Sequence, residues 1–212
     1  MGRFFSFDSP LVTFLSKAVD LVILNVLTIL CCIPVVTIGA AVTALYTATG
    51  RMRREEGSLV RDYFRAFRTN FKQATVLWLV FLIIGALLAY SLYFYACMEM
   101  TGRLALMAVT VMLFLLWNLV LAWVFPLLSR FDNTVGRTLH NAVLCSVAYL
   151  PRSLAMAVLN AVPWLLLFYA TFFFLQSGLL WFAIWFSLAA YLNQGLLSKP
   201  FDRLIEQTGG LA

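Results

Sequence analysis

Five long apolar blocks alternate with short polar connections along the chain. The blocks cover residues 18–50, 74–97, 104–128, 154–175 and 178–198, and the only formal charge inside them is Asp20. A helix of about 20 apolar residues, rising about 1.5 Å per residue, crosses a hydrocarbon core of about 30 Å. The pattern therefore predicts an all-α, polytopic membrane protein that forms a single membrane domain over residues 1–212.

The first block contains residues that interrupt a helix. Ser9-Pro10 predicts a helix start, with serine as the N-cap and proline at the first helical position. Pro34 removes a backbone donor and clashes with the preceding turn, and Gly39 follows five residues later. We therefore expect a break between these two residues. The broken block, residues 10–50, is either one kinked crossing or a short hairpin that returns to its starting side.

The distribution of basic residues favours the hairpin. Residues 51–72 carry seven Lys and Arg residues against three acids, and a short basic connection of this kind stays in the cytoplasm. A hairpin also places Arg3 and Lys17 on that side, whereas a single crossing leaves them outside. Segment length favours the single crossing, because each arm of the hairpin is short. We favour the hairpin, which puts the N-terminus in the cytoplasm. The C-terminus is expected there in either case, because an even number of crossings follows the cytoplasmic residues 51–72.

A weak internal repeat agrees with this preference. Three amphipathic stretches, residues 4–17, 58–72 and 133–152, each precede a pair of apolar segments. The second and third pairs are the predicted hairpins 74–128 and 154–198. Together with the first block they give six crossings, with amphipathic helices on the cytoplasmic surface.

Composition excludes several classes of protein. Charged residues make up 11% of the chain, whereas soluble domains have roughly 25%. The net charge of +6 comes from residues that flank apolar segments, which argues against a nucleic-acid partner. The sequence has no phosphate-binding glycine loop, nucleophile elbow or zinc-protease motif, and its four cysteines and single histidine form no ligand pattern. We expect a non-enzymatic protein without a metal or cofactor.

The stretch 58–72 is the strongest candidate for a contact surface. Its aromatic and basic residues recur at helical spacing in two stripes, which is typical of a helix at a membrane surface. The same pattern also suits docking to a cytoplasmic partner, and both roles are compatible. The candidate residues are Arg61, Phe64, Arg65, Phe67, Arg68, Phe71 and Lys72.

Polar residues inside the apolar blocks are the second group of candidates. A carboxylate deep in lipid costs at least about 2–3 kcal/mol, so Asp20 is expected either to pair with Lys17 near the interface or to face a polar cavity. The amides in the later blocks are expected to form hydrogen bonds between helices. The polar intramembrane candidates are Asp20, Asn25, Thr37, Asn118, Asn160 and Asn193.

Three motifs resemble those of the YesL-like bacterial membrane proteins, a family of unknown function. The first consists of Asp20-Leu21, Asn25, Cys32-Ile33-Pro34-Val35-Val36-Thr37-Ile38-Gly39 and Thr43-Ala44-Leu45-Tyr46. The second consists of Asp62-Tyr63-Phe64-Arg65-Ala66-Phe67-Arg68 and Asn70-Phe71-Lys72-Gln73-Ala74. The third consists of Phe125-Pro126-Leu127-Leu128-Ser129-Arg130-Phe131 and Asn141-Ala142. The resemblance implies a bacterial inner-membrane protein often encoded near carbohydrate uptake and degradation systems.

Two functional hypotheses follow from these features. The first is an accessory subunit of a carbohydrate transporter, embedded in the bilayer and contacting transporter subunits through residues 58–72. The second is a stand-alone transporter or channel for a small solute, in which Asp20, Asn25 and Thr37 line a polar path. A purely structural or regulatory protein is the third possibility, and the residues leave the solute, the partner and the oligomeric state open.

Overall fold

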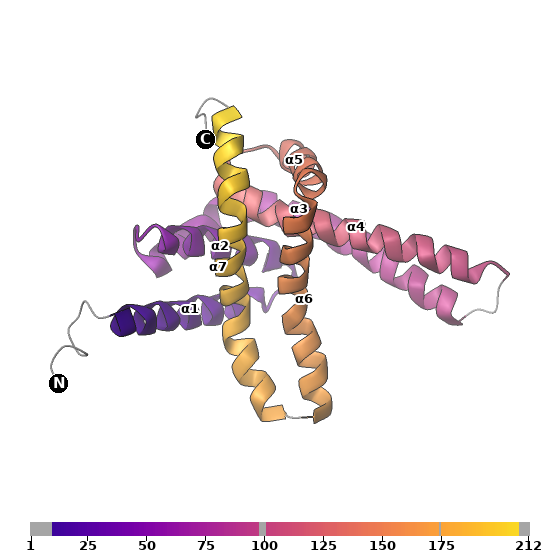
Figure 1. Ribbon diagram of the computed structural model, residues 1–212, viewed down its shortest axis with the longest axis horizontal. Helices are drawn as coiled ribbons and strands as arrows, with labels where there is room; N and C mark the ends of the chain where they lie inside the picture. The colour runs from indigo at the N-terminus through magenta and orange to yellow at the C-terminus, as the bar shows by residue number, and fades with distance from the viewer. Residues whose placement is uncertain (1–9, 98–100, 174, 208–212) are drawn as a thin grey trace.

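The computed structural model describes residues 10–97, 101–173 and 175–207, and within these ranges every regular element is helical. Figure 1 shows long helices projecting from a shared centre. The elements are α1 (Pro10–Cys32), η1 (Val35–Thr37), α2 (Ile38–Arg53), α3 (Leu59–Cys97), α4 (Arg103–Arg130), α5 (Val135–Ala148), α6 (Leu150–Phe173) and α7 (Leu175–Gln207).

Several of these helices carry apolar side chains on their outer surfaces. Among the described residues, α1, α3 and α4 are long and apolar enough to cross a membrane, and α5 with α6 would add a fourth span if the bent pair acts as one. Large apolar side chains such as Leu87 and Leu104 are 62% and 74% exposed. Water disfavours such a surface, whereas lipid accommodates it. The chain is a helical membrane protein, as the sequence predicted, and the six crossings stay a prediction.

The first apolar block reverses its direction. Helix α1 ends at Cys32, just before Pro34, and the short 3-10 turn η1 leads into α2. The Nζ atom of Lys17, near the start of α1, lies 3.2 Å from a carboxylate oxygen of Glu55, just beyond the end of α2. The two ends of the block are therefore on the same side, which is the hairpin arrangement. Whether both arms cross the bilayer stays a prediction.

Gly39 does not belong to the break. It is the second residue of α2, and a Cβ atom there would overlap the carbonyl oxygen of Ala74 and the Cβ of Trp78 on α3. The prediction that Gly39 interrupts a helix was wrong, because its lack of a side chain serves close helix packing instead. The indole nitrogen of Trp78 also donates a hydrogen bond of 2.8 Å to the Val35 carbonyl, which fixes the true break against α3.

Helix α2 lies at the centre of the molecule. It contacts α1, α3, α4 and α7, and most of its residues are buried. Those residues are mainly small, and the hydroxyls of Thr43 and Thr49 donate hydrogen bonds of 2.8 Å to carbonyls of their own helix, four residues back. Small side chains let helix backbones approach closely in lipid, and the internal hydrogen bonds leave these hydroxyls satisfied.

The amphipathic stretch 58–72 is not a separate helix. It forms the first turns of α3, which continues without a break to Cys97 and is about 58 Å long at about 1.5 Å per residue. The boundary expected near residue 73 is absent because neither proline nor glycine occurs between Leu59 and Ile84. The start of residues 4–17, the first such stretch, lies outside the described residues.

The third amphipathic stretch does form a helix of its own. Helix α5 is bent by 105° relative to α6, and the break falls at Tyr149, two residues before Pro151. A proline ring clashes with the carbonyl four residues earlier, so α5 cannot continue through it. The Ser153 hydroxyl contacts the carbonyls of Ser146 and Tyr149, and it accepts a hydrogen bond of 2.7 Å from the buried Trp123 indole. The hydrogen bond between Trp123 and Ser153 therefore holds the bend against α4.

The two later hairpins point in different directions. In Figure 1 the α3–α4 hairpin projects to the right, the α6–α7 hairpin projects downward, and α1 extends to the left. All three meet around α2 and the second half of α4, where residues 122–128 are buried. The arrangement therefore differs from three parallel copies of one repeat.

Replacing Gly39 with alanine should destabilise the protein. The added methyl group forces α2 away from the α3 backbone, and such overpacking costs about 1–3 kcal/mol. Thermal unfolding of the purified protein in detergent, followed by circular dichroism, should show a lower midpoint. Gly136→Ala is the matched control, because nothing lies within 4 Å of its Cβ position. Equal midpoints for both variants would contradict the close packing at Gly39.

Candidate functional site

One face of the first turns of α3 is exposed, and we call it the basic-aromatic face. Phe64 and Phe71 on it are 40% and 37% exposed. None of its four basic residues forms an ion pair with another described residue. The face therefore offers free positive charge beside exposed aromatic rings. It consists of Arg61, Phe64, Arg65, Arg68, Phe71 and Lys72.

Phe67 is separate from that face. It is only partly exposed and packs against the buried core, although its ring centroid lies 5.6 Å from that of Phe71. The predicted aromatic stripe thus divides into two exposed rings and one that helps to hold the helix in place.

The opposite face of the same turns is anchored in the protein. Asp62, Tyr63 and Ala66 are buried there. A carboxylate oxygen of Asp62 accepts a hydrogen bond of 2.6 Å from the Arg51 guanidinium at the end of α2. The other carboxylate oxygen occupies the space that a Cβ on Gly57 would fill, so the turn between the helices requires glycine. This ion pair and turn fix how the basic-aromatic face is presented.

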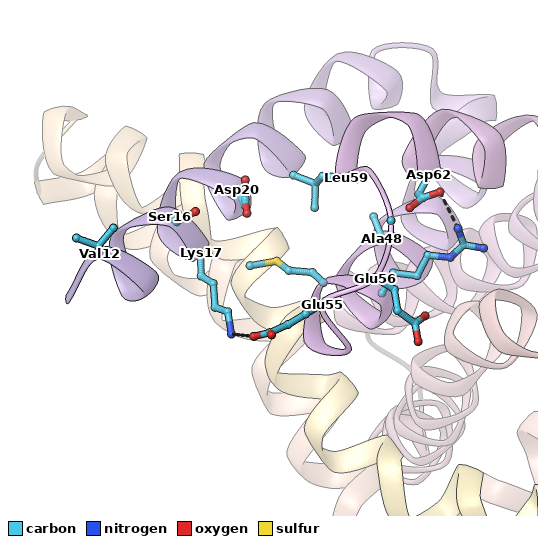
Figure 2. Close-up of a pocket in the computed structure, with 12 residues that line it drawn as sticks. Val12, Ser16, Lys17, Asp20, Ala48, Glu55, Glu56, Leu59 and Asp62 are labelled. Carbon is cyan, nitrogen blue, oxygen red and sulfur yellow. Dashed lines mark hydrogen bonds and ion pairs between the residues drawn. The ribbon is translucent and has the colours of Figure 1, made fainter. Parts of the chain in front are cut away.

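A pocket of about 410 Å³ lies beside this anchor, and we call it the charged pocket. Figure 2 shows its side chains coming from α1, the end of α2, the following turn and the start of α3. It contains both cations and carboxylates, so its walls are polar although they border apolar helices. Its lining residues with charged side chains are Lys17, Asp20, Arg51, Glu55, Glu56 and Asp62.

Asp20 lines the charged pocket without an ion pair to any described residue. The predicted pairing of Lys17 with Asp20 was wrong, because Lys17 instead bonds Glu55 across the hairpin, as the dashed line in Figure 2 marks. The reversal of the chain brings the Glu55 carboxylate to Lys17, a contact that spacing along α1 alone does not reveal. Asp20 was expected either to pair with Lys17 or to face a polar cavity, and in the structure it faces a cavity.

Asn25 and Thr37 do not join Asp20 in a polar path. Asn25 is fully buried, and its side-chain oxygen accepts a hydrogen bond of 3.1 Å from the backbone nitrogen of Ser187, which joins α1 to α7. Thr37 donates a hydrogen bond of 2.7 Å to the Pro34 carbonyl and stabilises the break locally. Asp20 therefore lines a pocket, Asn25 joins two helices, and Thr37 stabilises a turn.

Two of the later asparagines meet in the core. The Asn193 amide nitrogen lies 2.9 Å from the side-chain oxygen of Asn160 and 2.9 Å from the Tyr46 hydroxyl. These hydrogen bonds connect α2, α6 and α7. Asn118 lies apart on α4, where it is partly exposed and its side chain forms no hydrogen bond with another described residue.

The sequence did not predict the residues that connect the end of α2 to α3 and α7. In the sequence, Arg51 and Asp62 stand out only as charges in a polar connection. Tyr46 lies in a motif that assigns it no role. The Gln194 side chain donates a hydrogen bond of 2.7 Å to the Tyr46 carbonyl. A signal was present for Asp62, because Asp62, Tyr63 and Ala66 form a third face at helical spacing. No local pattern marks the other three.

The comparisons with known proteins give one match. Residues 21–92 match the model of a family described as "Protein of unknown function, DUF624". This segment includes the break, all of α2, the Arg51–Asp62 pair and the basic-aromatic face. No curated protein and no solved structure matches the chain. The chain is similar, over this segment, to a family without an assigned activity.

Asn193→Ala should lower stability more than Asn118→Ala. The first change leaves the Tyr46 hydroxyl and the Asn160 amide without their shared partner, and an interhelical hydrogen bond in membrane proteins contributes about 0.6–2 kcal/mol. The midpoints of thermal unfolding in detergent measure both effects. A loss of the same size in the two variants would argue against the core network.

Proposed function

We propose that this chain is a non-enzymatic protein of the bacterial inner membrane that acts as an accessory subunit of a carbohydrate transporter. The basic-aromatic face is its cytoplasmic contact with transporter subunits. The proposal that the partner belongs to carbohydrate uptake comes from the resemblance to the YesL-like family. The proposal that a contact lies on this face comes from the exposure and charge of its residues.

The unpaired charge on a continuous helix supports a protein partner. The apolar part of α3 begins near Ala74, so the first 15 residues rise about 22 Å above it if the helix continues straight, at about 1.5 Å per residue. The headgroup region extends only about 5–7 Å beyond each side of the hydrocarbon core. Arg61 and Phe64 would then stand beyond the lipid headgroups, where a protein surface can meet them.

The partner that suits this face carries acidic residues around an apolar depression. Guanidinium groups pair with carboxylates, and exposed phenylalanines lose unfavourable contact with water when they enter such a depression. The Arg51–Asp62 pair, in which only the aspartate is buried, holds the helix in one orientation, so little conformational freedom is lost on binding.

Phe64→Ser/Phe71→Ser should release the partner and leave the protein folded in the membrane. The tagged protein would be purified from its native host in mild detergent, and co-purifying proteins would be quantified by mass spectrometry. We expect stoichiometric recovery of transporter subunits with the wild type and at least about a tenfold loss with the variant, since one exposed aromatic anchor commonly contributes more than about 1 kcal/mol.

The matched control is Phe94→Ser. Phe94 lies on the same helix and has the same exposed fraction, 37%, as Phe71, but it belongs to the apolar end. It should retain the partner. Unchanged recovery from the double variant, or recovery of the wild-type protein alone, would contradict the accessory role.

A stand-alone transporter or channel is the second candidate function, and the position of Asp20 in the charged pocket favours it. For that function, Asp20→Asn should abolish solute flux in proteoliposomes while thermal stability stays unchanged. Glu56→Gln is the control, because Glu56 lines the same pocket but its side chain is 61% exposed. Absence of flux with the wild-type protein for every tested sugar would count against this function.

A further inference from the structure

A second pocket, which we call the arginine pocket, lies where the ends of α2 and α4 meet α7. Its volume is about 410 Å³, within the range of small-molecule sites. Three arginines line it, Arg51 and Arg54 at the end of α2 and Arg130 at the end of α4, and its other described polar residues are uncharged. The lining residues are Tyr46, Thr47, Gly50, Arg51, Arg54, Ser129, Arg130, Gln194 and Ile205.

Most of the hydrogen-bond donors of these arginines have no partner among the residues that the structure describes. A guanidinium has five N–H donors. Arg51 has one bond of 2.6 Å to Asp62, and Arg54 has one contact of 3.5 Å with Glu56. Arg130 forms no ion pair with another described residue. The three arginines that line the pocket therefore keep most of their donors without a partner among the described residues.

The neighbouring acids do not fill the arginine pocket. Asp62 and Glu56 line the charged pocket on the other side of Arg51, and among the side chains that the structure describes, no Asp or Glu lines the arginine pocket. Arg130 is within electrostatic range of Asp202 and Glu56, but neither reaches ion-pair distance. It is also repelled by Arg54, a like charge that an anion between the two would neutralise.

We propose that the arginine pocket binds the phosphate group of a phosphate ester. Guanidinium forks match phosphate oxygens, and a tetrahedral group presents oxygens to donors that converge from several directions. A carboxylate has only two oxygens in one plane. The volume also leaves room for more than the phosphate itself. The ligand is either a membrane phospholipid, bound through its headgroup, or a soluble phosphate compound.

The arginines also lie near the carbonyl ends of two helices, which attract positive charge. Helix α2 ends at Arg53 and α4 ends at Arg130. Each helix end carries only about half a negative elementary charge, and the effect is confined to the last turn. Helix termination alone would not require arginines from both helices to line one cavity. A purely structural role also predicts no response to phosphate.

Phosphate binding can be measured on the full-length protein in an uncharged detergent. Thermal midpoints would be recorded while inorganic phosphate replaces chloride at constant ionic strength. A ligand that binds only the folded state raises the midpoint in a saturable way. We expect this response in the wild type, with the apparent affinity about tenfold weaker in Arg130→Gln, because a charge-assisted bidentate contact is lost. Arg137→Gln, an exposed residue on α5, should behave as the wild type.

A lipid arm distinguishes the two sources of phosphate. The protein would be placed in nanodiscs of phosphatidylcholine with or without phosphatidylglycerol, and retained lipid would be counted by native mass spectrometry. Retention that Arg130→Gln abolishes identifies a lipid headgroup, whereas a phosphate response without retention identifies a soluble compound. If wild-type protein shows neither, or if Arg130→Gln and Arg54→Gln both respond as the wild type does, the proposal is overturned. It is independent of the partner contact on α3.

Discussion

The close approach of α2 to α3 is the contact on which the rest of the structure depends. It places a helix of mostly small residues in the middle of the molecule, where four other helices reach it. Gly39 permits this approach, and the Trp78–Val35 hydrogen bond holds the preceding turn against the same partner helix. Arg51, at the far end of α2, donates a hydrogen bond to Asp62 on α3. It also lines the arginine pocket together with residues of α4 and α7.

Arg51 lies between two pockets whose lining residues differ in charge. On one side it faces a pocket that contains four carboxylates, and on the other it joins two further arginines. Arg53, two residues along, turns toward α7, where its guanidinium donates a 3.0 Å hydrogen bond to the Tyr191 carbonyl and lies over the Tyr191 ring. The last turn of α2 thus contributes polar side chains to both pockets and to the contact with α7.

The fold class was predictable because apolar periodicity and length report directly on a lipid environment. Pro34 likewise marked the end of α1, since proline acts through its own backbone. Gly39 was misread because glycine serves equally in a break and in a tight helix crossing, and only the neighbouring helix decides between them. The Lys17–Glu55 and Asn160–Asn193 contacts depend on how distant helices come together, which no local pattern contains. The basic-aromatic face was visible in the sequence, but the inward position of Phe67 was not.

The unbroken length of α3 has a mechanical consequence. A single helix without a glycine or proline in its first half resists bending, so its two ends move as one body. A tilt of a few degrees imposed at the basic-aromatic face would shift the far tip, about 58 Å away, by several ångströms. The Arg51–Asp62 pair lies near the fixed end of this lever. It would act as the pivot about which force applied at the start of α3 is transmitted to the other end of the helix.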